Sequence, residues 1–497
     1  MSGPDSDEQV GGIDPADLAT ALRVLDELAS LPEDHPHVVT VQRASGRLHK
    51  LLRKQRRAQA KRAAREPLLA HDRAVLDATA TGNPLRIDDE TKGIPLTSPA
   101  PGAIAGELRI PRGCYICHSK YTTVDAFYHW LCPACAASSH ARRDQGTDLT
   151  GRRALLTGGR AKIGMHIALR LLRDGADLTI TTRFPKDAAR RFAALADSPE
   201  WLDRLTVVGI DLREPTQVVA LAGEVAARGP LDILINNACQ TVRRSPGAYS
   251  HLVEGERTPL EAGPTPRMLT FDRISEAHPA ALAGTLRTGE HSHALDAIRV
   301  DVAALALQAG SASLEAYRAG TAIDAGGLLP DLASTNSWTA RVDEVDALEM
   351  LEVQLCNQIA PFLLVSRLRP SLRAAVERGA RRAYVVNVSA MEGQFSRRYK
   401  GPGHPHTNMA KAALNMLTRT SASELFTTDQ ILMTAVDTGW ITDERPHQTK
   451  LDIAAEGWHA PLDLVDGAAR VYDPIVRGEA GEDLYGVFLK DYEPHPW

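Results

Sequence analysis

Residues 152–183 read RRALLTGGRAKIGMHIALRLLRDGADLTITTR and predict a strand, a glycine-rich turn, a helix and a second strand. The apolar run 154–156 ends at Thr157-Gly158-Gly159, and Ile and Leu then recur at helical spacing until Gly175. A strand that enters a helix through glycines directs free backbone N–H groups and the positive end of the helix dipole to one point. A dinucleotide pyrophosphate binds at such a point, so the stretch predicts a nucleotide-binding α/β fold.

The composition argues against several classes of protein. The 497 residues suffice for about three domains of roughly 150 residues each. The formal net charge of −5 is small for this length and gives no reason to expect binding to nucleic acid or to a membrane. No run approaches the ~20 apolar residues of a membrane span, the acidic N-terminal residues do not resemble a secretory signal, and the six cysteines do not suggest a disulfide framework. We expect a cytoplasmic protein.

The chain before residue 111 predicts a helical region and a linker. Residues 1–78 are predicted to be mainly helical, and residues 41–65 within them carry many Arg and Lys and no acid. This basic segment is either a surface for an acidic partner or the solvated face of a long helix that packs through Leu48, Leu51 and Leu52. Because it lacks aromatic residues for stacking, we do not expect it to bind nucleic acid. Residues 79–110 are rich in Gly, Pro and Thr and predict a linker.

Residues 111–145 contain two CxxC pairs, Cys114/Cys117 and Cys132/Cys135. Four thiolates at this spacing can surround a zinc ion tetrahedrally, with Zn–S distances of about 2.3 Å. A site with four cysteine ligands has no open coordination position, so we expect the zinc to be structural. His118 or His129 could replace one cysteine. The short distance to the glycine-rich strand favours docking of this module on the following domain.

Residues 149–497 alternate predicted strands and helices. Strands are predicted at 205–210, 231–235, 383–388 and 431–436, and a helix at about 406–425. This βαβ alternation predicts a doubly wound parallel sheet with a cofactor at the C-terminal ends of its strands.

The motifs of this region resemble those of the short-chain dehydrogenase/reductase family. They are, in order, Thr157-Gly158-x-x-x-x-Ile163-Gly164, Asp211-Leu212, Asn236-Asn237-Ala238, Asn357, Ser389, Lys411 and Thr438-Gly439. The resemblance covers about residues 149–490. It implies a Rossmann fold, an NAD(P) cofactor, hydride transfer at a carbonyl, hydroxyl or enoyl carbon of a small molecule and, by analogy, a homo-oligomer.

The resemblance also implies roles for the matching residues. Gly158 and Gly164 would hold the pyrophosphate, Asp211 and Leu212 would contact the adenine, and Asn237 and Ala238 would line the adenosine ribose. Lys411 would hold the nicotinamide ribose hydroxyls, and Asn357 would keep a water in the proton relay. The residues expected to contact the cofactor are Thr157, Gly158, Ile163, Gly164, Asp211, Leu212, Asn237, Ala238, Lys411, Thr438, Gly439 and Ile441.

The end of the second predicted strand favours NADP(H) over NAD(H). Preference for NAD(H) needs a carboxylate there to accept a hydrogen bond from the ribose 2′-OH, but the chain reads Thr181-Thr182-Arg183. Arg183 can instead pair with a 2′-phosphate, and Arg160 or Lys162 in the turn could join it.

Three departures from the family pattern concern the chemistry. Lys162 occupies the position of the usual glycine before Ile163. The usual acid is a Tyr four residues before the Lys, and this position is Thr407, whose hydroxyl is far too weak an acid to replace a phenol. The usual Ser falls on Ala390, and Ser389 precedes it on the opposite side of the strand.

Two residues could supply the missing acid. The fourth departure from the family pattern is a long insertion. Tyr399 lies in the loop that walls the nicotinamide in this family, and His406 lies directly before Thr407. The insertion, at about residues 241–338, is compatible with a lid, a substrate-specificity domain or an oligomerisation arm.

The sequence therefore leaves two functions open. The first is an NADP(H)-dependent oxidoreductase with a rearranged proton relay, in which Tyr399 or His406 is the acid. The second is a catalytically impaired pseudoenzyme that binds NAD(P) as a sensor or as a scaffold for other proteins.

Overall fold

The computed structural model describes residues 14–84, 86, 102–244, 246–271, 324, 326–330 and 333–497. The chain divides into two compact units, Met1–Asp72 and Arg73–Trp497.

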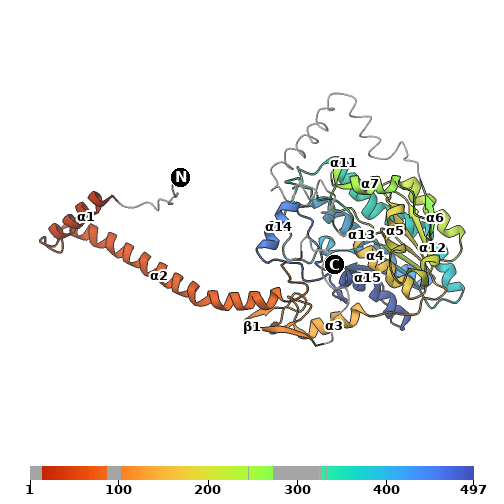
Figure 1. Ribbon diagram of the computed structural model, residues 1–497, viewed down its shortest axis with the longest axis horizontal. Coiled ribbons are helices and arrows are strands. Elements are labelled where there is room, and N and C mark those ends of the chain that lie inside the picture. Colours follow the sequence, from red (N-terminus) through yellow and green to blue (C-terminus); the bar gives the residue numbers. More distant parts are fainter. Residues whose placement is uncertain are drawn as a thin grey trace, which may run out of the picture. The chain divides into compact units, whose positions relative to one another are not determined.

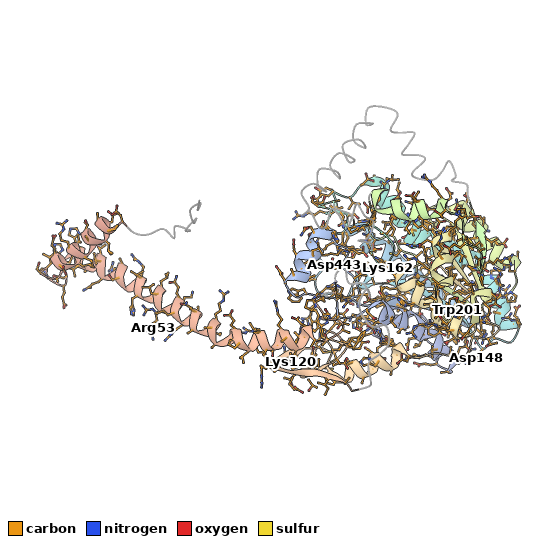
Figure 2. The ribbon with its side chains drawn as sticks, viewed as in Figure 1. Arg53, Lys120, Asp148, Lys162, Trp201 and Asp443 are labelled. Atoms are coloured by element: carbon orange, nitrogen blue, oxygen red, sulfur yellow. The ribbon has the colours of Figure 1, made fainter. Side chains whose placement is uncertain are left out.

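The first unit is helical over its described residues. Helix α1 (Pro15–Leu28) begins after Asp14, whose side chain accepts a hydrogen bond from the backbone N–H of Ala16 at 2.7 Å. Helix α2 (Pro36–Asp77) contains the basic segment 41–65, whose residues, such as Arg53, are mostly exposed (Figure 2). The predicted helix is confirmed, whereas the packing expected of Leu48, Leu51 and Leu52 is wrong, because all three are exposed.

The second unit is built on a sheet of nine strands within the described residues. Their order is β11-β10-β9-β8-β6-β3-β4-β5-β7, and all neighbours are parallel except β10 and β11. The predicted doubly wound parallel sheet is confirmed. The strands are β3 (Arg153–Leu156), β4 (Asp177–Thr182), β5 (Leu205–Gly209), β6 (Ile233–Asn236), β7 (Arg267–Thr270), β8 (Ala383–Ser389), β9 (Ile431–Asp437), β10 (Phe488–Lys490) and β11 (Glu493–His495).

Helices cover both faces of this sheet (Figure 1). Helices α4 (Lys162–Arg173), α5 (Pro185–Ala193) and α15 (Leu464–Glu479) pack on one face, and α6 (Pro215–Ala227), α12 (Ala360–Glu377) and α13 (Pro405–Asp429) on the other. Successive residues of a strand point to opposite faces of the sheet. Leu156 packs in the core on the α4 side, and Leu155 packs in the core on the α6 side. The shorter helices are η1 (Ser198–Glu200), η2 (Leu202–Arg204), η3 (Pro246–Tyr249), α7 (Ser250–Arg257), α11 (Ala347–Gln354), η4 (Leu355–Ile359), η5 (Met391–Gly393) and α14 (His447–Ala455).

The continuous helical stretch Ala347–Glu377 is long and apolar enough to cross a membrane, contrary to the expectation that no such run exists. Half of its most apolar window is buried, and α12 contributes Leu364, Leu368 and Leu372 to the core beneath the sheet. The core helix of a soluble protein has the same composition, so the stretch is weak evidence for a membrane span.

The predicted insertion, 241–338, is described only in part. Strand β7 lies within it and pairs with β5, so this part extends the sheet. Residues 272–323 lie outside the described residues. The expectation that the insertion forms a lid, a specificity domain or an oligomerisation arm falls mainly on these residues.

The four-cysteine module consists of an antiparallel hairpin, β1 (Ile104–Gly113) and β2 (Lys120–Asp125), followed by α3 (Pro133–Arg143). The linker prediction is wrong for residues 104–110, because β1 already begins at Ile104. The expected docking on the Rossmann domain is confirmed. One core joins Phe127, Tyr128 and Leu131 of the module to Ile441 and Leu464.

Buried charges strengthen this docking. Arg143 of the module lies 2.6 Å from Asp463 and 3.1 Å from Asp466, at the start of α15. Tyr128 donates a hydrogen bond of 2.6 Å to Asp466. Removing one partner of such a buried pair leaves an uncompensated charge, so these contacts oppose any displacement of the module.

Candidate active site

The glycine-rich turn after β3 has room only for glycine at Gly158, Gly159 and Gly164. Gly158 has φ +71°, and a Cβ there would lie 2.9 Å from Cα of Ala238. A Cβ at Gly164 would lie 2.0 Å from the carbonyl oxygen of Gly158. Thr157 braces the turn, because its Oγ1 accepts hydrogen bonds from the N–H groups of Asn237 and Ala238, each at 3.0 Å. The turn therefore leaves an open cradle at the start of α4.

Lys162 has a left-handed backbone conformation, which glycine adopts most easily. Its φ is +53°, which costs a residue with a side chain about 1 kcal/mol. Lys162 thus adds a charge at the start of α4 (Figure 2). The Nζ atom of Lys162 lies 3.0 Å from Oδ2 of Asp324, from the insertion. Burial opposes ionisation of Asp324, but the charge of Lys162 holds the pKa of this carboxyl below its ordinary value.

A cavity of about 380 Å³ lies at the C-terminal ends of β3, β4, β5 and β6. This volume is in the range of small-molecule sites. Ten of the predicted cofactor residues line it: Gly158, Arg160, Lys162, Ile163, Gly164, Arg183, Asp211, Leu212, Asn237 and Ala238. Phe184, Tyr249, Thr442 and Glu444, which the sequence did not single out, also line it.

The three cations predicted to bind phosphate differ in their partners. Arg160 lies 2.5 Å from Asp187 and donates a hydrogen bond of 2.6 Å to the carbonyl of Gly326. Lys162 has Asp324 as its partner. Arg183 is exposed beside the cavity and lies over the ring of Tyr249, at 5.0 Å from its centroid. Among the described residues, Arg183 forms no ion pair with a carboxylate. Arg160 and Lys162 are each paired with a carboxylate, so the expectation that they can join Arg183 in binding a phosphate is wrong in this conformation.

Asp211, which the family resemblance assigns to the adenine, is an ionised acceptor. Arg213 donates hydrogen bonds to both of its carboxylate oxygens, one of them at 2.6 Å. Burial opposes ionisation of Asp211, yet Arg213 holds the pKa of this carboxyl below its ordinary value. Arg213 is itself anchored to Glu352 of α11 at 2.8 Å.

Lys411 and Thr407 lie one turn apart on α13, as predicted, and both are buried. Lys411 donates a hydrogen bond of 2.8 Å to the carbonyl of Val388, at the end of β8. Thr407 Oγ1 lies 3.4 Å from the carbonyl of Thr241, so the segment after Asn-Asn-Ala covers it.

Ser389 does not replace the missing serine. Its hydroxyl donates a hydrogen bond of 2.6 Å to Asn415, one turn beyond Lys411 on α13, and it is buried there. Ala390 follows it in extended conformation, so the two side chains point to opposite sides. The resemblance makes Ser389 a candidate catalytic residue, but in this conformation its hydroxyl binds Asn415 and does not support that role.

Asn357 lies in the π-helix η4, between α11 and α12. A π-helical turn is uncommon and is often found at a functional site. The side-chain amide of Asn357 accepts a hydrogen bond of 2.7 Å from the backbone N–H of Gln240. It donates a hydrogen bond of 2.9 Å to the backbone carbonyl of Gln240. Asn357 therefore holds the backbone after Asn-Asn-Ala, where the resemblance implied a bound water.

Neither predicted replacement acid is brought to Lys411. Tyr399 is 74% exposed, in the polar loop before α13, and neighbouring Lys400 turns back to the carbonyl of Met391 at 3.1 Å. His406 is buried, and burial lowers the pKa of its imidazole. Within the described part of the chain, neither ring nitrogen of His406 has a hydrogen-bond partner, and neither residue lines the cavity. The assignment of Tyr399 or His406 as the acid is not supported by this geometry.

Asp437 is a titratable group that the sequence analysis overlooked. It ends β9 directly before Thr438-Gly439, and its Oδ1 accepts a hydrogen bond of 2.9 Å from the N–H of Gly439. Complete burial, helped by the charges of Asp491 and Glu392, raises the pKa of Asp437 to about 6, although the N–H of Gly439 and the charge of Lys490 oppose this rise. The sequence signal for a functional role is its position directly before the loop expected to contact the nicotinamide. The same position is also typical of the last residue of a strand.

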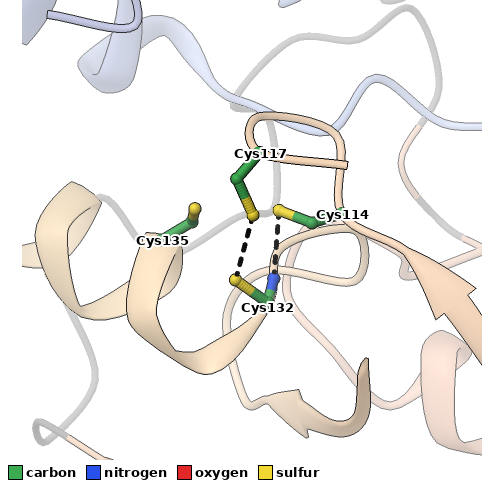
Figure 3. Close-up of side chains that lie close together, drawn as sticks. All are labelled: Cys114, Cys117, Cys132 and Cys135. Atoms are coloured by element: carbon green, nitrogen blue, oxygen red, sulfur yellow. Dashed lines mark hydrogen bonds between the residues drawn. The ribbon is translucent and has the colours of Figure 1, made fainter. Parts of the chain in front are cut away.

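The four cysteines converge on one point (Figure 3). All four sulfur atoms lie within 4.8 Å of one another, and those of Cys117 and Cys132 are 3.6 Å apart. A tetrahedral zinc site requires S–S distances of about 3.8 Å, so the cluster fits the ion. A hydrogen bond with Ser119 lowers the pKa of the Cys117 thiol to about 6, which favours the thiolate. His129 instead hydrogen-bonds Thr81 at 2.8 Å, and His118 is exposed.

The sequence and the structure are similar to those of several known proteins. The family model described as short chain dehydrogenase matches residues 152–252. An uncharacterized protein of Acanthamoeba polyphaga mimivirus, R665, is 30% identical over 375 residues, which cover 73% of this chain and 71% of that protein. A probable oxidoreductase of Streptomyces antibioticus is 42% identical over 91 residues, 18% of this chain and 30% of its own. The solved structure of the carbonyl reductase Sniffer of D. melanogaster has 17% identity and a TM-score of 0.42, over 70% of this chain and 100% of its own. The glycine-rich strand, turn and helix that form the cradle fall within the segment that the family model matches, so this part of the chain is similar to short-chain dehydrogenases.

Proposed function

We propose that the protein is an NADP(H)-dependent oxidoreductase that acts on a carbonyl, hydroxyl or enoyl group of a small molecule, with a rearranged proton relay. The observation that carries the preference for NADP(H) is Arg183. It directly follows β4 beside the cavity, has no carboxylate partner among the described residues, and stands where an NAD(H)-specific site needs an acid.

The part of the cavity lined by the glycine-rich turn, Arg183 and Asp211 supports binding of the adenosine and pyrophosphate parts of the cofactor. The cradle at Gly158 and Gly164 would hold the pyrophosphate at the start of α4, and Arg183 would pair with the 2′-phosphate. Asp211 would accept a hydrogen bond from the adenine amino group. The pyrophosphate competes with Asp324 for Lys162, so binding is expected to rearrange that ion pair.

NADPH, when bound, supplies a hydride to an electrophilic carbon of the substrate. The chain must supply a proton, and Asp437 is the group that we propose for this role. It ends β9 at the C-terminal edge of the sheet and, like Tyr399 and His406, does not line the cavity; its Oδ2 has no hydrogen-bond partner within the described residues, and its pKa of about 6 lets it hold a proton in mildly acidic solution. Lys411 keeps the role of binding the nicotinamide ribose.

A second candidate function is a pseudoenzyme that binds NADP(H) without turnover, as a sensor or scaffold. The observations that favour it are the position of Thr407 beneath Thr241 and the contact of Ser389 with Asn415. Both candidates require NADP(H) binding, and only the first predicts oxidation of NADPH in the presence of a carbonyl or enoyl compound.

Replacement of Arg183 tests the cofactor assignment. Arg183→Ala removes a charge-assisted contact worth about 1.5–3 kcal/mol, so the Kd for NADPH should rise about 10- to 100-fold while the Kd for NADH stays unchanged. Fluorescence titration of both nucleotides measures these constants. Arg173→Ala is a matched control, because Arg173 pairs with Asp197 at 2.7 Å at the other end of α4. An equal loss for both nucleotides would remove the argument for NADP(H).

We further propose that the four cysteines hold a structural zinc ion. The close packing of the sulfur atoms supports this assignment. A homo-oligomer and a cytoplasmic location stay predictions from the sequence.

A further inference from the structure

The four-cysteine module reaches the loop that follows β9. Tyr115 lies directly after Cys114, and its hydroxyl oxygen accepts a hydrogen bond of 2.9 Å from the backbone N–H of Trp440. The same oxygen lies 3.7 Å from the position that a Cβ at Gly439 would occupy. Trp440 stands between Gly439 and Ile441, two residues expected to contact the nicotinamide. A side chain of the module therefore supports the backbone at this point.

Further contacts hold the same loop against the module. The rings of Trp130 and Trp440 pack edge to face, with centroids 5.8 Å apart. Ile441 is buried in the core that includes Cys114 and Phe127. The loop is therefore held both by a hydrogen bond from its backbone to Tyr115 and by packing of its side chains.

Arg86, just before the module, fixes the chain that runs beside this loop. It is buried and donates hydrogen bonds of 2.6 Å to the carbonyls of Ala460 and Leu462. A Cβ at Gly439 would lie 2.6 Å from the side chain of Leu462, so Leu462 and the loop are in close contact. Movement of the loop toward the module is therefore blocked.

The other end of the loop belongs to the cofactor cavity. Thr442 and Glu444 line the cavity, whereas Trp440 and Ile441 contact the module. Only a few residues separate the two sets of contacts. The position of this wall of the cavity thus depends on the module.

We propose that Tyr115 is a positioning residue of the cofactor site. Through it, the metal bound by the four cysteines is coupled to binding of the nicotinamide half of NADP(H). The inference rests on the proposed NADP(H) binding. Because Cys114 and Cys117 flank the turn that carries Tyr115, a bound metal fixes this turn and thereby the acceptor for Trp440. A module that only stabilises the fold would change the thermal stability but would not discriminate between the two halves of the cofactor.

The test compares NADPH with 2′,5′-ADP, which has the 2′-phosphate and adenosine but no nicotinamide. Tyr115→Phe keeps the ring and removes the acceptor for the partly buried N–H of Trp440, so NADPH should bind on the order of tenfold more weakly. Binding of 2′,5′-ADP should be unchanged. Tyr121→Phe is the matched control within the module, because its hydroxyl donates to the carbonyl of His129 at 3.1 Å, and it should change neither affinity. Isothermal titration calorimetry on the full chain measures all of these constants.

The outcomes separate the two proposals. If the wild type binds both ligands and Tyr115→Phe weakens both equally or neither, the positioning role is wrong. If the wild type binds neither ligand, the proposed function fails and this inference fails with it. A second arm uses the wild type with its metal removed by a chelator. There, selective weakening of NADPH supports the coupling, and equal or no weakening of the two ligands overturns it.

Discussion

The burial of Asp437 predicts that this carboxylate destabilises the fold at neutral pH. Its pKa rises from an ordinary value of 3.8 to about 6. A shift of about two units corresponds to about 3 kcal/mol. Because the folded pKa is the higher one, the cost is absent below about pH 4, develops between pH 4 and 6, and is complete above about pH 6. Asp437→Asn keeps an acceptor for the N–H of Gly439 and removes this cost.

The gain from Asp437→Asn can be converted to a melting temperature. At about 2 cal/mol/K per residue, the unit Arg73–Trp497 has an unfolding entropy of about 0.9 kcal/mol/K, so the Tm should rise by about 3 °C at pH 7.5. At pH 5 the gain should be about half as large. Differential scanning calorimetry at both pH values tests this. Asp452→Asn, an exposed acid on α14, is the control and should change the Tm at neither pH. A gain that is the same at both pH values would refute the assignment of the cost to the ionised carboxylate. The same variant should lose NADPH oxidation if Asp437 supplies the proton.

Two other predictions concern the turn and the metal. Gly164→Ala places a Cβ 2.0 Å from the carbonyl oxygen of Gly158, so the affinity for NADPH should fall by at least about tenfold; Gly223→Ala, whose Cβ meets nothing within 4 Å, is the control. Equal affinities of these two variants in a fluorescence titration would show that the cradle does not bind the pyrophosphate. Cys132→Ser should abolish binding of one zinc ion per chain and lower the Tm, because the metal replaces a larger core in the module. Metal analysis and calorimetry measure both effects, Cys239→Ser should retain the ion, and full zinc content in Cys132→Ser would contradict the site.

Much of the fold follows from local sequence patterns. Strands β8 and β9 begin at Ala383 and Ile431, as predicted, because apolar runs bounded by turns encode buried strands directly. The cradle was also predictable, since Gly158 and Gly164 have no room for a side chain. By contrast, β1 replaces part of a predicted linker, because its residues pair with β2 and the pairing is a tertiary contact.

The parts of the site that the sequence did not predict depend on contacts between distant segments. Ser389 lies beside the expected position, but Asn415 of α13 determines where its hydroxyl points. Tyr399 has the chemistry of the missing acid, but its loop keeps it at the surface. Tyr115 reaches Trp440 from more than three hundred positions away, and no local pattern encodes such a contact.

The central claim, that the cavity at the ends of the parallel strands binds NADP(H), is tested most directly by calorimetric titration of the full chain with NADPH and with NADH. We expect one site per chain with a clear preference for NADPH, because Arg183 meets a 2′-phosphate that NADH lacks. Absence of binding by both nucleotides would contradict it, and would mean that Lys162 and Asp324 keep the phosphate turn closed.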